Sequence, residues 1–152
     1  MAESDDPIAA ATERARRLLA AREHSRLELR RKLQQRGHPE DAIEPALDRL
    51  EAEGALDEAR LVEEYIAERA AKGFGPLRIR AELREKGLTE ALIDPALDQV
   101  KEDWSAYMAE VYDRRFGSAP PPDHDEYARR GRFLEQRGFP VEMIRRFLRW
   151  PD

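Results

Sequence analysis

An internal repeat constrains the fold of this chain more than any other feature. Residues 25–50 overlay residues 75–100 at an offset of 50 without a gap, and ten of the 26 aligned pairs are identical. A third, more divergent copy follows at an offset of 51 and has Leu134, Gly138 and Ile144 where the second copy has the same residue types. Such a period is typical of proteins built from stacked tandem units, because one short unit cannot bury its apolar face alone.

Each unit is predicted to contain three helices. Apolar residues recur at helical spacing, and no stretch shows the alternation of a β-strand. The first helices are predicted at about residues 8–23, 57–72 and 104–116, the second at about 26–36 and 76–86, and the third from about Pro39, Thr89 and Pro140. The pattern therefore predicts an all-α fold in which three tandem three-helix repeats stack into an elongated, curved rod.

The predicted helix ends set the unit boundaries. We expect a disordered N-terminus at residues 1–7, repeats at residues 8–54, 55–102 and 103–152, and a proline-rich loop at about residues 117–124. Ser25 and Pro76 suit the starts of the second helices.

Glycines and prolines mark two further features of the units. The second helices are followed by glycines, which tolerate the positive φ of a helix end, at Gly37, Gly87 and Gly138. Pro45 and Pro95 fall in the third helices, which either kink there or begin at the proline. We favour the kink.

Composition excludes several classes of protein. The chain has no Cys, so disulfides, thiolate chemistry and cysteine-based metal sites are ruled out. It lacks an apolar run of the roughly 18 residues that a membrane span needs. The residues before Pro7 are acidic, which is unlike a signal peptide. We therefore expect a cytoplasmic protein.

The charges alternate along the chain. Residues 26–37 sum to +4, residues 40–60 sum to −6, and the whole chain carries −5. A uniformly basic DNA-binding domain does not have this pattern. Alternating stripes instead favour oriented docking onto a charged partner.

No catalytic or metal-binding motif is evident. His24, His38 and His124 are isolated, without a second ligand at metal-binding spacing. The chain also lacks a glycine-rich phosphate loop, a nucleophile elbow and paired carboxylates. We expect a monomer that is not an enzyme and that holds no metal or cofactor.

The basic second helices are the best candidates for contact with a partner or with DNA. The candidate residues are Arg30, Arg31, Lys32, Arg36, Arg80, Arg84, Lys86, Arg129, Arg130, Arg132 and Arg137. Arg78, Glu82 and Lys86 stand four apart, which is also the pattern of ion pairs on a solvated face. Arg80 and Arg84 have no acid in their own row, so we expect them to be freer to meet a partner.

Asp57, Glu58 and Arg60 look like a site, but a structural role explains them. Asp57 suits an N-cap, Glu58 suits the first helical turn, and Arg60 is expected to pair with a carboxylate that fixes units one and two. The aromatic residues of the last third, up to Trp150, are interpreted as core, with stacking on nucleic-acid bases as the alternative.

One motif runs from Gly54 through Leu56, Asp57 and Arg60 to Val62 and is followed by residues 75–87. It is similar to the central motif of the RecX family. Residues 132–139 resemble its closing motif. The family pattern usually has a second Asp and an aromatic residue where this chain has Glu58 and Leu61. The structural positions of the resemblance are Gly54, Leu56, Asp57, Arg60, Gly87 and Gly138.

The resemblance implies a function. RecX-like proteins regulate the RecA recombinase, mostly as inhibitors, and lie in the groove of the RecA–single-stranded-DNA filament. The chain is then expected to limit filament growth, ATPase and strand exchange, in DNA recombination, DNA repair and the SOS response. Two alternatives stay open: a helical module that binds single-stranded or double-stranded DNA directly, and a scaffold for another helical partner.

Overall fold

The computed structural model describes residues 6–149 of the chain. Every regular element in these residues is a helix, so the predicted all-α class is confirmed. The helices are α1 (Pro7–Ala21), α2 (Arg26–Gln35), α3 (Glu40–Ala52), α4 (Glu58–Ala71), α5 (Pro76–Glu85), α6 (Glu90–Gln99), α7 (Trp104–Phe116), α8 (His124–Arg137) and α9 (Val141–Leu148). A short 3₁₀ helix, η1 (Lys101–Asp103), precedes α7. Residues 1–5, most of the predicted disordered stretch, lie outside the described residues.

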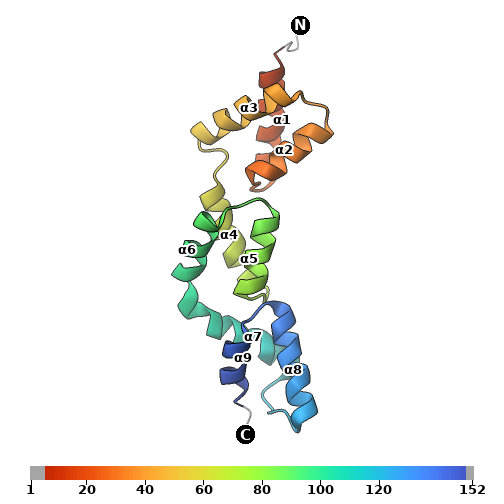
Figure 1. Ribbon diagram of the computed structural model, residues 1–152, viewed down its shortest axis with the longest axis vertical. Helices are drawn as coiled ribbons and strands as arrows, with labels where there is room; N and C mark the ends of the chain where they lie inside the picture. The colour runs from red at the N-terminus through yellow and green to blue at the C-terminus, as the bar shows by residue number, and fades with distance from the viewer. Residues whose placement is uncertain (1–5, 150–152) are drawn as a thin grey trace.

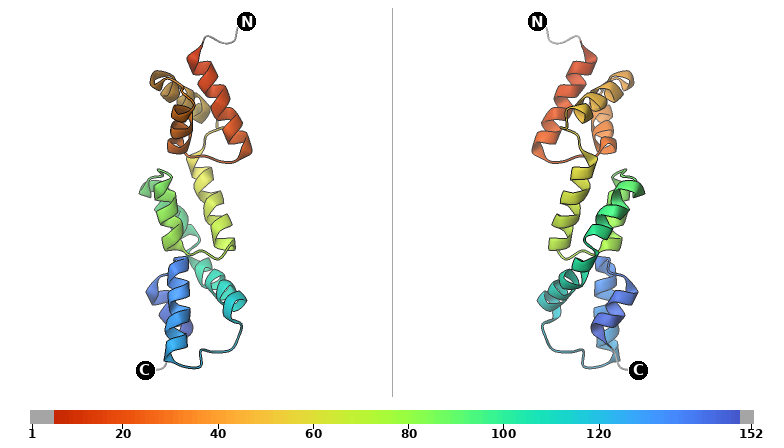
Figure 2. Two further views of the ribbon diagram at one scale, coloured as in Figure 1. Left: turned by 90° about the vertical axis from the view of Figure 1, so that its right-hand side faces the viewer. Right: turned by 90° about the vertical axis from the view of Figure 1, so that its left-hand side faces the viewer.

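Helices α1–α9 of the described residues form three units stacked along one long axis. Figure 1 shows α1–α3 at one end, α4–α6 in the middle and α7–α9 at the other end, so the molecule is elongated. In Figure 2 the second helices α2, α5 and α8 follow one another along one side. The first helices α1, α4 and α7 follow one another along the opposite side. This alignment gives the rod two different long faces.

Local sequence signals define the helix starts. The Ser25 hydroxyl accepts from the Glu28 amide at 3.1 Å, and the Glu28 carboxylate accepts from the Ser25 amide at 2.8 Å. This reciprocal capping box satisfies two amides that lack partners at a helix start. Pro76 occupies the first position of α5, as expected. Asp57 caps α4 by accepting from the Arg60 amide at 3.0 Å.

The two prolines of the third helices lie inside α3 and α6. The alternative in which these helices begin at the proline is therefore wrong. Both Pro45 and Pro95 are exposed. An exposed position tolerates proline because water can satisfy the carbonyl that loses its intrahelical donor.

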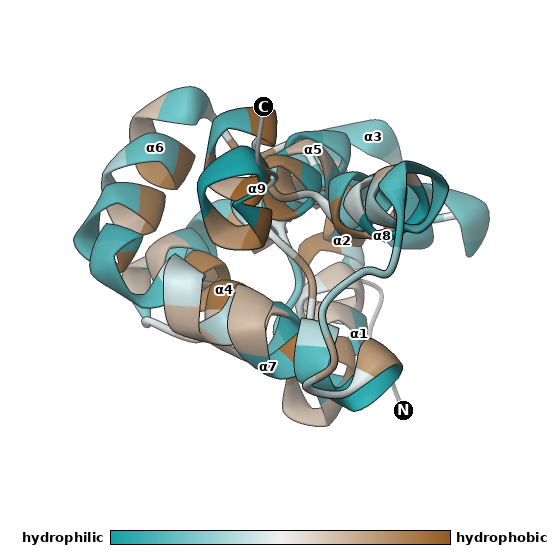
Figure 3. Ribbon diagram, turned by 90° about the horizontal axis from the view of Figure 1, so that it is seen from below, coloured by the Kyte–Doolittle hydropathy of each residue, from teal (hydrophilic) through white to brown (hydrophobic). Residues whose placement is uncertain are grey.

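Two separate hydrophobic cores lie along the rod. Unit one has its own core, built around Leu29, Leu33 and Ile43 and closed by Leu56 at the start of unit two. Units two and three share a second core. Figure 3, seen along the long axis, shows hydrophobic residues facing inward between helices and hydrophilic residues on the outside. The chain is thus one rod with a division of its apolar packing after unit one.

The aromatic residues of the last third belong mainly to the shared core. Trp104, Tyr112 and Phe139 are buried. Tyr107 and Phe147 pack partly buried against them. The interpretation as core is confirmed for these residues, whereas Trp150 lies outside the described residues.

The second helices meet end to end. The Ser25 hydroxyl at the start of α2 donates to the Lys86 carbonyl at the end of α5, at 2.6 Å. The amides of Gly75 and Leu77 at the start of α5 donate to the carbonyls of Arg137 and Gly138 at the end of α8, at 2.7 and 3.0 Å. The last carbonyls of one second helix therefore accept hydrogen bonds from the start of the next second helix in the row. Without these bonds the carbonyls would lack a partner, because a helix end has no intrahelical donor for them.

Glycine is required at these joints for two reasons. Gly87 has φ +90°, and a Cβ there would lie 2.7 Å from the Leu27 Cβ. Gly138 has φ +106°, and a Cβ there would lie 2.5 Å from the Arg78 Cβ. Gly37 is the equivalent residue of unit one, with φ +81°, but a Cβ there would meet nothing within 4 Å. The glycine turn is therefore packed against the next unit at Gly87 and Gly138, whereas the same turn at Gly37 has no neighbour.

We expect Gly87→Ala to destabilise the protein more than Gly37→Ala. Both substitutions place a side chain at positive φ, which costs about 1–2 kcal/mol. Gly87→Ala additionally displaces Leu27, and such overpacking costs about 1–3 kcal/mol more. Urea unfolding followed by circular dichroism measures both. Equal losses from the two variants contradict the joint as a tight contact.

Candidate partner-binding surface

The candidate residues of α2 fall into paired and unpaired cations. Arg30 forms an ion pair with Glu44 of α3. Lys32 lies 2.9 Å from Nε2 of His24, whose Nδ1 is 2.9 Å from a backbone carbonyl. Because the carbonyl can only accept, Nδ1 carries the hydrogen and Nε2 accepts from Lys32. Burial lowers the pKa of His24, which favours this neutral ring.

Arg31 and Arg36 form the other group on α2. Both are exposed, and neither forms an ion pair or hydrogen bond with another side chain of residues 6–149. These two guanidiniums are therefore the cations of α2 that can meet a partner without breaking an existing contact.

The candidates of α5 are all paired. Arg80 contacts Asp94 at 2.8 Å and Glu90 at 3.2 Å, and Arg84 contacts Glu90 at 3.6 Å. Hydrogen bonding from Arg80 lowers the pKa of Asp94. The expectation that Arg80 and Arg84 are freer to meet a partner is therefore wrong. Their acids come from α6 of the same unit, and the row of α5 alone could not reveal them.

Lys86 contributes to a joint rather than to an open face. It contacts Glu28 of unit one at 3.1 Å. Glu28 also caps α2, and the amide of Ser25 and the ammonium of Lys86 both lower its pKa against the opposing effect of burial. The ion pair thus ties α5 to the start of α2.

The candidates of α8 differ from one another in burial. Arg129 is exposed and pairs with Glu126 at 2.9 Å. Arg130 is buried and donates to the Tyr112 hydroxyl at 2.7 Å and to the Ala119 carbonyl at 2.9 Å. The repeat gives Arg130 the position that Ile79 occupies in unit two. Arg130 therefore takes the place of a core side chain and is not on the surface. Its hydrogen bonds are made inside unit three.

Arg132 and Arg137 are the remaining candidates of α8. Arg132 is exposed and forms no ion pair within the described part of the chain. Arg137 is half-buried, and its Nε atom is buried without a hydrogen-bond partner. Arg132 is exposed and unpaired, like Arg31 and Arg36, whereas Arg137 is partly enclosed by its neighbours.

The residues of the central motif hold units one and two together. The Glu58 carboxylate accepts from the Arg26 amide at the start of α2, at 2.8 Å. Arg60 pairs with Glu23, which lies between α1 and α2. It also reaches the Gly54 carbonyl at 3.3 Å. The carboxylate that Arg60 was expected to find is thus Glu23, and the contact spans the two units.

Sequence reasoning missed several cations. Arg145 and Arg146 on α9 and Arg115 on α7 are exposed and form no ion pair among the residues described. A signal was present for Arg145, because the repeat aligns it with Asp94 and Glu44 of the other third helices. Arg115 gives no such signal, because the Phe133 ring that it lies over comes from another helix.

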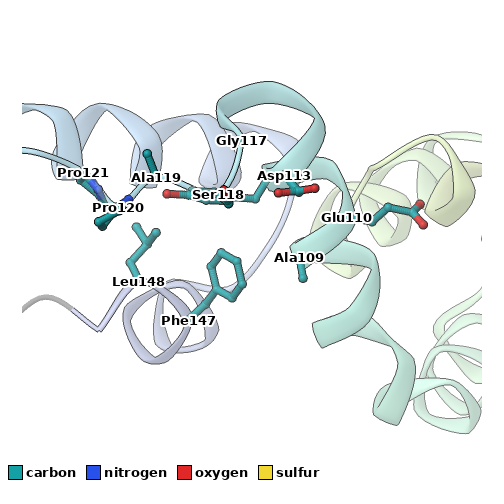
Figure 4. Close-up of a pocket in the computed structure, with 11 residues that line it drawn as sticks. Ala109, Glu110, Asp113, Gly117, Ser118, Ala119, Pro120, Pro121, Phe147 and Leu148 are labelled. Carbon is teal, nitrogen blue, oxygen red and sulfur yellow. The ribbon is translucent and has the colours of Figure 1, made fainter.

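One pocket lies in unit three. It is an open hollow of about 550 Å³ between α7, the proline-rich loop and α9, lined by Phe147 and Leu148 among others (Figure 4). No Arg, Lys or His of the described chain lines it. Of its two carboxylates, Glu110 lies apart from the loop in Figure 4 and pairs with Arg114 at 3.6 Å.

The described residues offer neither a metal site nor a membrane-spanning helix. Among residues 6–149, no group of three or more His, Asp or Glu side chains is arranged to hold a metal ion. Within the same range, no helix combines the length and the apolar character that crossing a bilayer requires.

Comparison with known proteins defines the family. Models described as the first, second and third three-helix domains of RecX match residues 11–50, 57–97 and 105–148. The chain belongs to the RecX family. The three matches coincide with the three structural units, so the divergent third copy is a family domain as well.

Relatives and solved structures agree with this assignment. The chain is 49% identical over 148 residues to "Regulatory protein RecX" of Pseudomonas entomophila, covering 97% of this chain and 95% of the relative. It is 47% identical to "Regulatory protein RecX" of Ectopseudomonas mendocina, covering 97% and 98%. A "Crystal structure of regulatory protein RecX" has a TM-score of 0.79 at 25% identity, covering 95% of this chain and 73% of that one. RecX from Lactobacillus salivarius has the same fold, with a TM-score of 0.80 at 20% identity, covering 96% of this chain and 97% of that one.

We expect Glu126→Gln to flatten the acid dependence of stability. Hydrogen bonds from Arg129 and Arg130 lower the pKa of Glu126 from 4.5 to about 2. A carboxylate with a lowered pKa stabilises the fold fully above its ordinary pKa and loses this effect as pH falls through the lower value. Melting temperatures between pH 4.5 and about 2 should thus fall less steeply in Glu126→Gln than in the native chain.

Glu142→Gln is the matched control, because Glu142 is an exposed carboxylate of the same unit that forms no ion pair in the described chain. An acid dependence that changes equally in both variants contradicts the role given to Glu126.

Proposed function

We propose that this chain regulates the RecA recombinase, mostly as an inhibitor. It binds in the groove of the RecA–single-stranded-DNA filament and limits filament growth, ATPase and strand exchange. The observation that carries the proposal is the match of all three structural units to RecX domains, together with relatives named as regulatory proteins. The proposed mechanism is steric and electrostatic.

The shape of the molecule supports docking along a filament. Three stacked units present long faces rather than one compact surface, and the second helices form one of these faces (Figure 2). An elongated ligand can contact several protomers of a filament at once, and linked contacts strengthen each other.

The unpaired cations define the proposed contact. Arg31 and Arg36 on α2 and Arg132 on α8 lie on the outer units of the second-helix row. The cations of α5 are already neutralised by α6 and by Glu28. We propose that the partner is held mainly through Arg31, Arg36 and Arg132, and only secondarily through Arg30, Lys32, Arg80, Arg84, Lys86 and Arg129.

The chain is further proposed to act as a cytoplasmic monomer without catalytic activity. Only two large apolar side chains of the described chain, Leu77 and Val141, are exposed, and single exposed apolar residues do not form a dimer interface.

The test is RecA ATPase on single-stranded DNA, titrated with the native chain and with Arg31→Glu/Arg132→Glu. We expect the native chain to inhibit and the variant to need at least about tenfold more protein, a loss of about 1.4 kcal/mol. Reversing two unpaired charges removes favourable contacts without exposing a buried partner.

Arg145→Glu/Arg146→Glu is the control, because it makes the same charge change at exposed, unpaired residues of α9. An equal loss in both variants contradicts the second-helix row as the contact. No inhibition by the native chain at saturation contradicts the regulation of RecA itself.

A further inference from the structure

An apolar groove runs between α4 and α6, which lie side by side in unit two (Figure 1). Two adjoining hollows of about 320 and 200 Å³ make it up, and both are lined by Glu63, Ala96 and Gln99. Ala67 of α4 and Tyr107 of α7 complete the larger hollow. We call the two hollows together the α4–α6 groove.

The internal repeat shows that the same apolar face is covered in unit one. Four apolar residues of α3 are buried: Ala42, Ala46, Leu47 and Leu50. Their counterparts on α6, at the offset of 50, are only half-buried: Leu92, Ala96, Leu97 and Val100. Apolar side chains at equivalent positions are therefore closed off from water in unit one and partly open to it in unit two.

The difference comes from the bulk of the first helices. Ala11 and Ala15 of α1 are buried in the core of unit one, and α1 packs more extensively against α3 than α4 does against α6. At the equivalent positions α4 carries Leu61 and Tyr65. Because the side chains at a helix contact set the distance between the helix axes, the larger residues leave the groove open.

The charges around the groove favour a positive occupant. Glu63 lines both hollows, is exposed and forms no ion pair within residues 6–149. Of the described chain, no Lys, Arg or His lines the groove. Helix α6 carries three acids and no cation, and the two arginines of α4 pair with Glu23 and Glu82 on other sides of the helix. A basic partner is therefore attracted and an acidic one repelled.

We propose that the α4–α6 groove binds a basic amphipathic helix of a partner protein, with apolar side chains in the two hollows and a Lys or Arg against Glu63. Ala59 and Ala70 mark the ends of the groove on α4 and lie about 16 Å apart along the helix axis. That length matches three helical turns of an occupant, whose apolar residues at i, i+4 and i+7 face one side. The inference does not require that the partner be RecA.

The occupant is a helix of another protein rather than of a second copy of this chain. Leu77 of α5 and Val141 of α9 are the only large apolar side chains exposed in the described chain, and they belong to different helices. Docking of a helix in a groove needs several apolar side chains on one helical face. A second copy therefore has no suitable helix to offer among its described residues.

The experiment measures fluorescence anisotropy of a labelled peptide with the full chain. The peptide has about 15 residues, with Leu at i, i+4 and i+7 and with Lys and Ala elsewhere, because shorter isolated helices are marginal in water. Ala67→Phe fills the larger hollow from an exposed position, and Glu63→Lys reverses the charge at the groove. We expect each variant to bind the peptide at least about tenfold more weakly than the native chain.

Each variant has a matched control outside the groove. Ala81→Phe makes the same change at an exposed alanine of α5, and Glu64→Lys makes the same charge reversal at the neighbouring exposed carboxylate, which also forms no ion pair in the described chain. Both controls should bind within about threefold of the native chain. A loss in the controls equal to that in the variants overturns the groove as the site.

A second peptide tests the recognition of a helix. It has the same composition in a shuffled order that leaves no apolar stripe, and it should bind at least about tenfold more weakly. Equal binding of the two peptides, or binding of neither, overturns the proposal. If Ala67→Phe fails to fold by circular dichroism, Glu63→Lys decides alone, and an unchanged affinity overturns the proposal.

Sedimentation velocity separates the partner helix from a second copy. The native chain should remain a monomer at all concentrations measured. A dimer that forms with rising concentration and that Ala67→Phe abolishes assigns the groove to a second copy of the chain and overturns the partner helix.

Discussion

The end-to-end hydrogen bonds between second helices are the contact on which the rest of the structure depends. Helix termini carry backbone groups without intrahelical partners, and a short helix has proportionally many of them. Here the carbonyls of Lys86 and Arg137 accept from Ser25 and Gly75 of the adjoining unit. The joint thereby satisfies groups that are costly to bury unpaired. It also sets the distance between units and allows no side chain at Gly87 or Gly138.

The charges of the chain serve this architecture first and a partner second. The acidic third helices neutralise much of the basic second helices, as Glu44 does for Arg30 and Asp94 for Arg80. A surplus of positive charge is left at the outer units of the row and at the joint of units two and three. The net charge of −5 for the whole chain therefore does not represent the local charge at either of these surfaces. What a charged partner meets is set by which arginines the fold leaves unpaired.

The sequence predicts the fold well because the signals are local. Ser25 and Asp57 cap their helices as expected, and the glycines end theirs at positive φ. Each of these signals acts within a single helix, and the repeat then carries the same pattern from unit to unit. The partner-binding residues are harder, because pairing depends on side chains from other helices. Arg80 is paired by an acid of α6, and Arg130 is buried beside Tyr112 of α7. Neither contact can be derived from spacing within one helix. The guanidiniums of Arg69, Arg78 and Arg137 converge on the Phe74 ring from three different helices, and no spacing in the sequence reveals this.

The division of the apolar packing after unit one has a thermodynamic consequence. Unit one meets unit two through ion pairs and hydrogen bonds, such as those of Arg60 and Glu58, whereas units two and three share one apolar core. Cooperativity in a stacked protein is carried by the interfaces between neighbours, and a polar interface weakens with salt while an apolar one does not. Unit one is therefore expected to unfold as one cooperative block and units two and three as another, and ionic strength is expected to change the stability of their interface.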